Sequence, residues 1–415
     1  MKSIQSYVRA LAIVAVLAWL PARAQQPAPG GGAAPRGHLV IIGGALRADT
    51  APVWERIVAL AGGKGARIAV IPAAAGNPLK SGGNIARYLN SYGASAFVLP
   101  VAPRLPGDVH KAANDEANVA ALRGAGGVYF AGGDQARITD ALRQPDGSPS
   151  RVLEAVWALY RRGGVIAGTS AGAAIMSSTM FYKTRPVLAT LQSGIVDGQD
   201  IAPGLGFIGP DVFVDQHFLV RGRFARMLLV LLAKGYRLGI GVDENTAIVV
   251  GPGRDAEVIG YKGVAVLDMS HATTDRQQAA FNVRDAVISY LDKGDRINLA
   301  SGAFTPSADK RDGKLDPADP SYTEPLYSAD ILGNTTVVDL MSKLIDSDQR
   351  DAVGLAFDGP REGAAPLGFE FRFRRAADSI GYVSATSEAV SVYRLRLDVR
   401  PIALGWPSYQ YRETK

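Results

Sequence analysis

The 415-residue sequence contains no cysteine. Disulfides, thiolate metal sites and a cysteine nucleophile are therefore excluded, and the fold must rely on its core. Histidine is scarce, with four residues, so a catalytic imidazole has few candidates. No apolar run is long enough to span a bilayer, which takes about 20 consecutive residues. What remains is a chain that is 47% hydrophobic and long enough for about two or three globular units at most.

The first 24 residues have the pattern of a secretory signal peptide. Lys2 and Arg9 precede the apolar run 10–20, and residues 22–24 (ARA) form a small-x-small cleavage pattern. Cleavage after Ala24 leaves 42 basic against 39 acidic residues, so the net charge falls from +6 to +3. This small excess gives little support for a nucleic-acid or membrane partner. We expect a secreted or periplasmic protein, with residues 25–36 (QQPAPGGGAAPR) as a disordered linker.

Residues 37–293 alternate buried-strand signatures with helix-compatible stretches. Continuous apolar runs are typical of strands covered on both faces, and they occur at residues 38–44, 67–71, 95–101, 126–131 and 163–168. Helical patterns lie between them, which predicts βαβ units in an α/β fold with a doubly wound, mostly parallel sheet.

Residues 294–415 differ in character and are predicted to form a mixed α/β C-terminal extension packed on the main domain. A polar loop region reaches residue 333, and Asn334 is expected to cap a helix over residues 334–345. Strict alternation over residues 369–373 and 393–399 predicts two strands with one buried and one wet face. The aspartates of the polar region lack the spacing of an EF-hand loop, so no metal site is predicted.

Residues 168–172 (GTSAG) match the G-x-S-x-G pattern of a nucleophile elbow. Ser170 would occupy a strained strand-to-helix turn, which requires neighbours as small as Gly168 and Gly172. The first N–H groups of the following helix would face the oxyanion formed when Ser170 attacks a carbonyl. The alternative interpretation is a tight turn with a buried serine. After the elbow, residues 179–204 are of mixed character and are expected to form a loop.

Two further segments follow predicted core strands, at the sheet edge where open α/β folds bind ligands. Residues 132–135 (GGDQ) follow the strand 126–131, although a turn that needs positive φ would also explain the glycines. His217 ends the strand 211–217, beside Asp215 and Gln216. The other three histidines have no such position, so His217 is the expected base for Ser170.

Residues 221–234 have apolar side chains at helical spacing, with three arginines near the start: Arg221, Arg223 and Arg226. Cations at a helix N-terminus oppose the helix dipole, so this placement favours an anionic ligand. A solvated basic face is the alternative.

Four segments resemble the cyanophycinases, in the peptidase family that also contains the aspartyl dipeptidase peptidase E. They are residues 130–135 (FAGGDQ), 168–174 (GTSAGAA), 215–226 (DQHFLVRGRFAR) and 241–247 (GVDENTA). The resemblance runs in order from about residue 38 to residue 269. Four ordered motifs are far more specific than the elbow alone.

The resemblance implies a fold similar to class I glutamine amidotransferases, with serine in place of cysteine at the elbow. It implies an exopeptidase without a cofactor that hydrolyses cyanophycin, multi-L-arginyl-poly-L-aspartate, to β-aspartyl-arginine dipeptides. Together with the signal peptide it indicates the extracellular branch, in which bacteria digest cyanophycin released by others. The polymer, or a related Asp/Arg isopeptide, is the expected partner, and a homodimer is left open.

Position by position, the resemblance implies that Ser170 is the nucleophile and His217 the general base. The N–H groups of Gly133 and Ala171 would form the oxyanion hole. Six positions match the family's substrate cleft: Gln135, Asp215, Gln216, Arg221, Arg223 and Arg226. Arginines suit the carboxylate of the polymer terminus, and an acid such as Asp215 suits the guanidinium of the substrate.

The acid that orients His217 is not fixed by these motifs. The resemblance implies a glutamate between the serine and the histidine, but no glutamate occurs between Ala171 and Gln216. Asp197, Asp200 and Asp215 are the candidates. Asp215 precedes His217 by two residues, so a strand would place both side chains on one face.

Three other functions stay open. A peptidase E-like dipeptidase would share the fold and the elbow. An α/β-hydrolase esterase shares G-x-S-x-G, but it places its acid and histidine much later and carries an HGGG-like loop, which is not visible here. A non-catalytic protein that binds arginine-rich peptides would follow if no acid orients His217.

Overall fold

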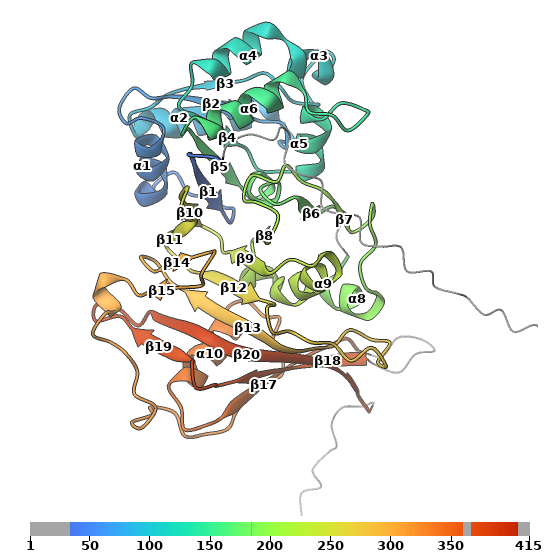
Figure 1. Cartoon of the computed structure of the whole chain (residues 1–415), viewed down its shortest axis with the longest axis vertical. Helices are drawn as coiled ribbons and strands as arrows, with labels where there is room; N and C mark the ends of the chain where they lie inside the picture. Colours follow the sequence, from blue (N-terminus) through green and yellow to red (C-terminus); the bar gives the residue numbers. More distant parts are fainter. Residues whose placement is uncertain (1–33, 184, 360–366, 406–415) are drawn as a thin grey trace, which may run out of the picture.

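The computed structural model describes residues 34–183, 185–359 and 367–405. The predicted signal peptide and most of the predicted linker lie outside the described residues. Figure 1 shows two large sheets one above the other, the upper one surrounded by helices and the lower one formed mainly by the end of the chain. Within the described ranges, every helix is too short or too polar to cross a membrane.

The first sheet has nine strands in the order β15-β14-β11-β10-β1-β5-β4-β2-β3. One half is parallel and consists of β1 (His38–Ile42), β2 (Arg67–Ile71), β3 (Ser95–Val98), β4 (Gly127–Phe130) and β5 (Val165–Thr169). The other half is antiparallel and consists of β10 (Thr246–Val250), β11 (Asp255–Gly260), β14 (Arg296–Asn298) and β15 (Phe304–Thr305).

Helices cover both faces of the parallel half. One face packs against α1 (Ala51–Leu60) and α2 (Pro78–Ser91). The other face packs against α3 (Val109–Asn114), α4 (Glu116–Arg123), α5 (Gln135–Leu142), α6 (Arg151–Arg161) and α7 (Ala171–Ala174). Successive residues of β1 alternate between the two cores, and all four from Leu39 to Ile42 are fully buried. The doubly wound α/β class predicted from the apolar runs is therefore confirmed.

The second sheet has the order β16-β17-β18-β20-β13-β12-β9-β8, with β19 beside β20. Its strands from before residue 294 are β8 (Val212–Gln216), β9 (Leu238–Val242), β12 (Val264–Asp268) and β13 (Val283–Leu291). Its later strands are β16 (Leu326–Ser328), β17 (Asp351–Phe357), β18 (Leu367–Arg374), β19 (Ile380–Val383) and β20 (Val390–Ala403). The domain boundary after residue 293 stays a prediction. Strands from both sides of it share this sheet.

Two helices pack on the second sheet: α9 (Phe224–Lys234) and α10 (Thr336–Ile345). The predicted alternation in β18 is confirmed, since Phe369, Phe371 and Phe373 are fully buried and join these helices in one core. The opposite face of β8, β9 and β12 packs into the core of the first sheet. The two sheets are therefore joined through the strands that bring His217 to the site.

Three local predictions differ from the structure. Residues 179–204, expected as a loop, include β6 (Thr179–Phe181), α8 (Val187–Ser193) and β7 (Ile201–Pro203). The polar region before residue 333 contains β14, β15, β16 and the 3₁₀ turn η2 (Ala308–Lys310). The prediction that Asn334 caps α10 is wrong. The helix begins at Thr336, so its N-cap is Thr335, which has a left-handed conformation.

Candidate active site

The chain turns sharply at Ser170, between the end of β5 and the start of α7. Ser170 has φ +52° and ψ −111°, a strained conformation for a residue with a side chain. A Cβ on Gly168 would lie 2.2 Å from the carbonyl oxygen of Gly172, and one on Gly172 would lie 2.4 Å from that of Phe130. The structure thus has the turn that the G-x-S-x-G pattern predicts, and both glycines are sterically required.

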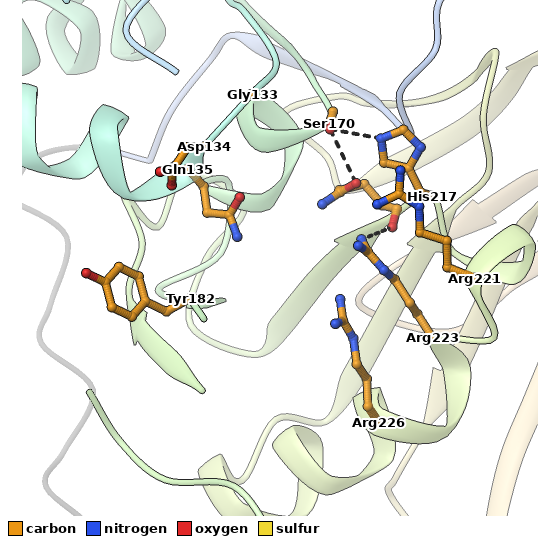
Figure 2. A pocket seen from close by; sticks show the side chains of 10 residues that line it. Gly133, Asp134, Gln135, Ser170, Tyr182, His217, Arg221, Arg223 and Arg226 are labelled. Carbon is orange, nitrogen blue, oxygen red and sulfur yellow. Dashed lines mark hydrogen bonds between the residues drawn. The ribbon is translucent and has the colours of Figure 1, made fainter. Parts of the chain in front are cut away.

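His217 lies directly beyond the end of β8, in a left-handed conformation with φ +47°. Its backbone N–H donates to the carbonyl oxygen of Gly43, which follows β1 (2.8 Å). Its Nε2 lies 2.9 Å from Oγ of Ser170 (Figure 2). Gly44 packs against the imidazole so closely that a Cβ there would lie 2.4 Å from Nε2. The carboxyl ends of β1, β5 and β8 therefore bring the predicted nucleophile and base into hydrogen-bond contact.

Glu244 supplies the acid that faces the other nitrogen of the ring. Its Oε1 lies 2.6 Å from Nδ1 of His217, and its side chain is about two-thirds buried. A neutral histidine that donates Nδ1–H to this carboxylate leaves Nε2 free to accept the proton of Ser170. The arrangement is a Ser–His–Glu triad in which the acid follows the histidine in the chain.

The expectation that an aspartate orients His217 is wrong. Each candidate is paired with a cation instead: Asp197 with Lys234, Asp200 with Arg185, and Asp215 with Arg223 and Arg226. The alternation argument for Asp215 fails because β8 ends at Gln216 and the positive φ of His217 turns its side chain out of the strand register.

Burial lowers the pKa of His217 below its usual value. The hydrogen bond that the ring donates to Glu244 opposes this change, while the positive charges of Arg221 and Arg223 add to it. The lowered pKa favours the neutral imidazole, which is the form that can take a proton from Ser170.

Of the two predicted oxyanion-hole residues, Ala171 follows Ser170 in the chain and Gly133 lines the same cavity as Ser170. Ala171 is the first residue of α7, so its N–H has no intrahelical acceptor. Gly133 has φ +141°, and a Cβ there would lie 2.1 Å from the carbonyl oxygen of Ala74. Among the described residues, neither N–H donates to another protein group. Both are therefore available to an oxyanion, and only glycine fits at position 133.

Asp215 lies beneath this site and is almost fully buried. Its Oδ2 is 2.7 Å from Nη2 of Arg226, and its Oδ1 is 3.3 Å from Nη1 of Arg223. Arg223 also donates to the carbonyl oxygen of Gln216 (2.6 Å), and burial lowers its pKa to about 10. The expectation that Asp215 binds a substrate guanidinium is wrong, because two arginines of the chain already occupy its carboxylate.

The three arginines do not lie in the first turns of one helix, as predicted. Arg221 ends the 3₁₀ turn η1 (Leu219–Arg221), Gly222 adopts a left-handed conformation, and α9 begins only at Phe224. Arg221 is exposed, whereas Arg223 and Arg226 are buried. The alternative of a solvated basic face is therefore wrong for Arg223 and Arg226.

A cavity of about 380 Å³ opens in front of Ser170. Figure 2 shows Gln135 and Tyr182 on one side of Ser170, and His217 with the arginines on the other. Its lining residues are Gly133, Asp134, Gln135, Ser170, Tyr182, Gln216, His217, Arg221, Arg223 and Arg226. Every predicted substrate-binding residue except Asp215 therefore lines one cavity.

Gln135 and Arg226 are both held by Phe181, the last residue of β6. Gln135 Nε2 donates to the carbonyl oxygen of Phe181 (2.7 Å), and the guanidinium of Arg226 lies 3.9 Å from the centre of its ring. No group of three or more His, Asp or Glu side chains within the described ranges is placed to hold a metal ion.

The family model of peptidase family S51 matches residues 39–258, which include the whole triad. The chain belongs to peptidase family S51. A cyanophycinase from Trichormus variabilis is 31% identical over 284 residues, covering 65% of this chain and 88% of the relative. A cyanophycinase from Geminocystis herdmanii is 32% identical over 274 residues, covering 63% of this chain and 94% of the relative.

A solved structure of a peptidase from an acI-B1 Actinobacterium is 20% identical, with a TM-score of 0.47 over 64% of this chain and 98% of that one. The family match and the two relatives identify the chain as a cyanophycinase-like serine peptidase. A sizeable part of this S51 peptidase lies outside the parts matched to the cyanophycinases.

Sequence reasoning missed three residues of this S51 site. Glu244 was part of a recognised motif but received no role, although it follows β9 just as His217 follows the adjacent parallel strand β8. Asp134 belongs to the GGDQ segment and caps α5 by accepting the N–H of Ala136. Tyr182 follows β6 in a region that was expected to be a loop, and no pattern in the sequence marks it.

Proposed function

We propose that this S51 peptidase is an exported exopeptidase that hydrolyses cyanophycin to β-aspartyl-arginine dipeptides through an acyl-enzyme. The observation that carries the proposal is the Ser–His–Glu triad at the mouth of a cavity lined by three arginines. The similarity to cyanophycinases from two bacteria supports the choice of polymer.

The chemistry follows from the contacts of the triad. Oγ of Ser170 attacks the backbone carbonyl carbon of the scissile bond while Nε2 of His217 takes its proton, and the carbonyl oxygen becomes an oxyanion near the N–H groups of Gly133 and Ala171. The C–N bond then breaks as His217 gives the proton to the leaving nitrogen. Water repeats the sequence on the ester and regenerates Ser170.

Charge complementarity supports an anionic end of the substrate on the arginine side. Arg221 is exposed at the cavity, so its guanidinium can bind a substrate carboxylate directly. The charges of Arg223 and Arg226 are shared with the single carboxylate of Asp215, so the group keeps a net positive charge. A free carboxylate at the end of the poly-aspartate backbone fits this side.

Incubation of the purified protein with insoluble cyanophycin, followed by mass spectrometry of the soluble products, tests the proposal. We expect β-aspartyl-arginine as the main product, and none with Ser170→Ala. Release of dipeptides from short aspartyl peptides but not from the polymer would instead indicate a peptidase E-like dipeptidase. Failure of a fluorophosphonate probe to label Ser170 would indicate a non-catalytic binding protein.

Export rests on the predicted signal peptide, which lies outside the described residues. Processing after Ala24 would give a mature chain that begins at Gln25. N-terminal sequencing of protein recovered from the periplasm and medium checks this part of the proposal. A full-length chain that retains Met1 and stays with the cells would contradict it.

A further inference from the structure

The turn that carries Arg221 and Arg223 lies between Asp243, the neighbour of the triad residue Glu244, and the C-terminal extension. On its inner side, the carboxylate of Asp243 accepts the N–H of Leu219 (2.8 Å). On its outer side, Gly222 packs against the backbone of Leu332. A Cβ on Gly222 would lie 2.7 Å from the carbonyl oxygen of Leu332 and 2.9 Å from its Cβ. The extension therefore touches the one residue between the two arginines.

Leu332 is itself held by the second sheet. Its neighbour Ile331 is fully buried and donates its N–H to the carbonyl oxygen of Leu355 on β17 (2.9 Å). The side chain of Ile331 lies over Gly354 so closely that a Cβ there would come within 2.5 Å of its Cγ1. Residues 331 and 332 thus lie between β17 and the turn that carries Arg221 and Arg223. They pack so closely that neither Gly354 nor Gly222 has room for a side chain.

The helix that continues from the turn also depends on the extension. The ring of Phe224, the first residue of α9, meets the ring of Phe371 on β18 edge-to-face with 5.3 Å between centres. The apolar face of α9 shares one core with β18, β20 and α10. Figure 1 shows α9 directly above these strands. Arg226, in the first turn of this helix, is therefore placed by packing against the extension.

We propose that residues 331 and 332 of the C-terminal extension act as a positioning element for substrate binding, by fixing the turn that presents Arg221 and Arg223 to the cavity. The inference rests on the proposed binding of a substrate carboxylate by this arginine side. It assigns a role to a part of the chain beyond residue 258, where the family match ends.

Gly354→Ala tests the element from β17, on the side of residues 331 and 332 that faces away from Gly222 and the cavity. The new methyl group displaces Ile331, and the displacement passes through Leu332 to Gly222. Because small misplacements of binding groups are costly, we expect KM for a soluble β-aspartyl-arginine oligomer to rise roughly tenfold, with kcat changed much less. The rate at which a fluorophosphonate labels Ser170 should stay at the wild-type value, because that reaction needs the triad and not the arginines.

Gly381→Ala is the matched control. It also places a methyl group against an isoleucine of the extension, since a Cβ there would lie 2.8 Å from Cγ1 of Ile345. This glycine is on β19, which pairs with β20 and lies on the opposite side of Figure 1 from α9. We expect a comparable loss of thermal stability with KM unchanged. If Gly354→Ala does not fold, Ile331→Val, which shortens the side chain that packs on Gly354, replaces it with the same expected direction.

A second readout separates this inference from the proposed function. Tetra-aspartate should protect Ser170 of the wild-type protein from the fluorophosphonate, and Gly354→Ala should weaken that protection while Gly381→Ala does not. This result would support the positioning role even if cyanophycin proves not to be the substrate. If Gly354→Ala and Gly381→Ala have the same KM and tetra-aspartate protects Ser170 equally well in both, the positioning role is wrong. This holds whatever substrate the wild-type protein hydrolyses.

Discussion

Glu244 Oε1 lies 2.6 Å from Nδ1 of His217, although 27 residues separate the two in the chain. The contact follows from the parallel pairing of β8 and β9, in which Gln216 lies opposite Val242. The residues just beyond both strand ends therefore meet at the edge of the second sheet. Ser170 arrives from the first sheet, so the triad forms where the two sheets join.

Replacing Glu244 by Gln should lower kcat by about 10⁴-fold while the protein stays folded. The amide keeps the size of the side chain, but it no longer stabilises the imidazolium that forms when Ser170 is deprotonated. Steady-state kinetics with the soluble oligomer measures the effect. Asp197→Asn is the control, because Asp197 pairs with Lys234 at an exposed position and should leave turnover unchanged. If Asp197→Asn lowers kcat more than Glu244→Gln does, Asp197 and not Glu244 orients His217.

Much of the first sheet could be predicted because its strands are buried on both faces. The continuous apolar runs around residues 39–42 and 67–71 reflect the helices that cover both faces of the sheet. The ends of these runs mark the edge of the sheet at which the active site lies. The elbow was predictable for a similar reason. Gly168 and Gly172 lie where any side chain would collide with the backbone, so the local sequence carries the geometry.

The acid and the arginine geometry could not be predicted, because both depend on long-range pairing. Glu244 and not Asp215 faces His217 because β9 is the strand that pairs with β8. No local sequence pattern shows which strand pairs with β8. The helical spacing in residues 221–234 correctly predicted a helix, but the left-handed Gly222 interrupts the segment, so the helix begins only at Phe224. Its conformation is fixed by contact with Leu332, which is 110 residues later in the numbering of the chain.

Ser170→Ala should preserve the fold and lower kcat by several orders of magnitude, up to about 10⁶-fold. The hydroxyl makes its close contact only with Nε2 of His217, at 2.9 Å, and a longer one with Gln216 at 3.5 Å. Thermal unfolding checks the fold and product release checks the activity. A folded variant with wild-type turnover would exclude the acyl-enzyme mechanism.

The acid limb of kcat/KM should lie below pH 6.5, the usual pKa of histidine. Burial lowers the pKa of His217, so the neutral base persists to lower pH and activity falls only when the ring is finally protonated. Arg221→Gln removes a positive charge that also lowers this pKa, so the limb should move to higher pH. Arg87→Gln, at an exposed position on α2, should leave the limb in place.

The structure separates the arginines into two classes that mutation should distinguish. Arg226→Ala leaves the buried carboxylate of Asp215 with only the longer of its two ion pairs, the one to Arg223, so the free energy of unfolding should fall by about 3–5 kcal/mol. Arg221→Ala removes an exposed side chain, so the free energy of unfolding should stay within about 0.5 kcal/mol of the wild type.

Activity should show the opposite order once it is normalised to folded protein. Loss of a charge-assisted contact between Arg221 and a substrate carboxylate should lower kcat/KM by roughly ten- to a hundredfold. Denaturant unfolding and oligomer hydrolysis, measured on the same preparations, test both halves. The exposed Arg104, which does not line the cavity, provides the matched control as Arg104→Ala and should change neither quantity. If Arg221→Ala unfolds as easily as Arg226→Ala while each folded molecule turns over at the wild-type rate, Arg221 is a structural residue and the carboxylate of the substrate binds elsewhere.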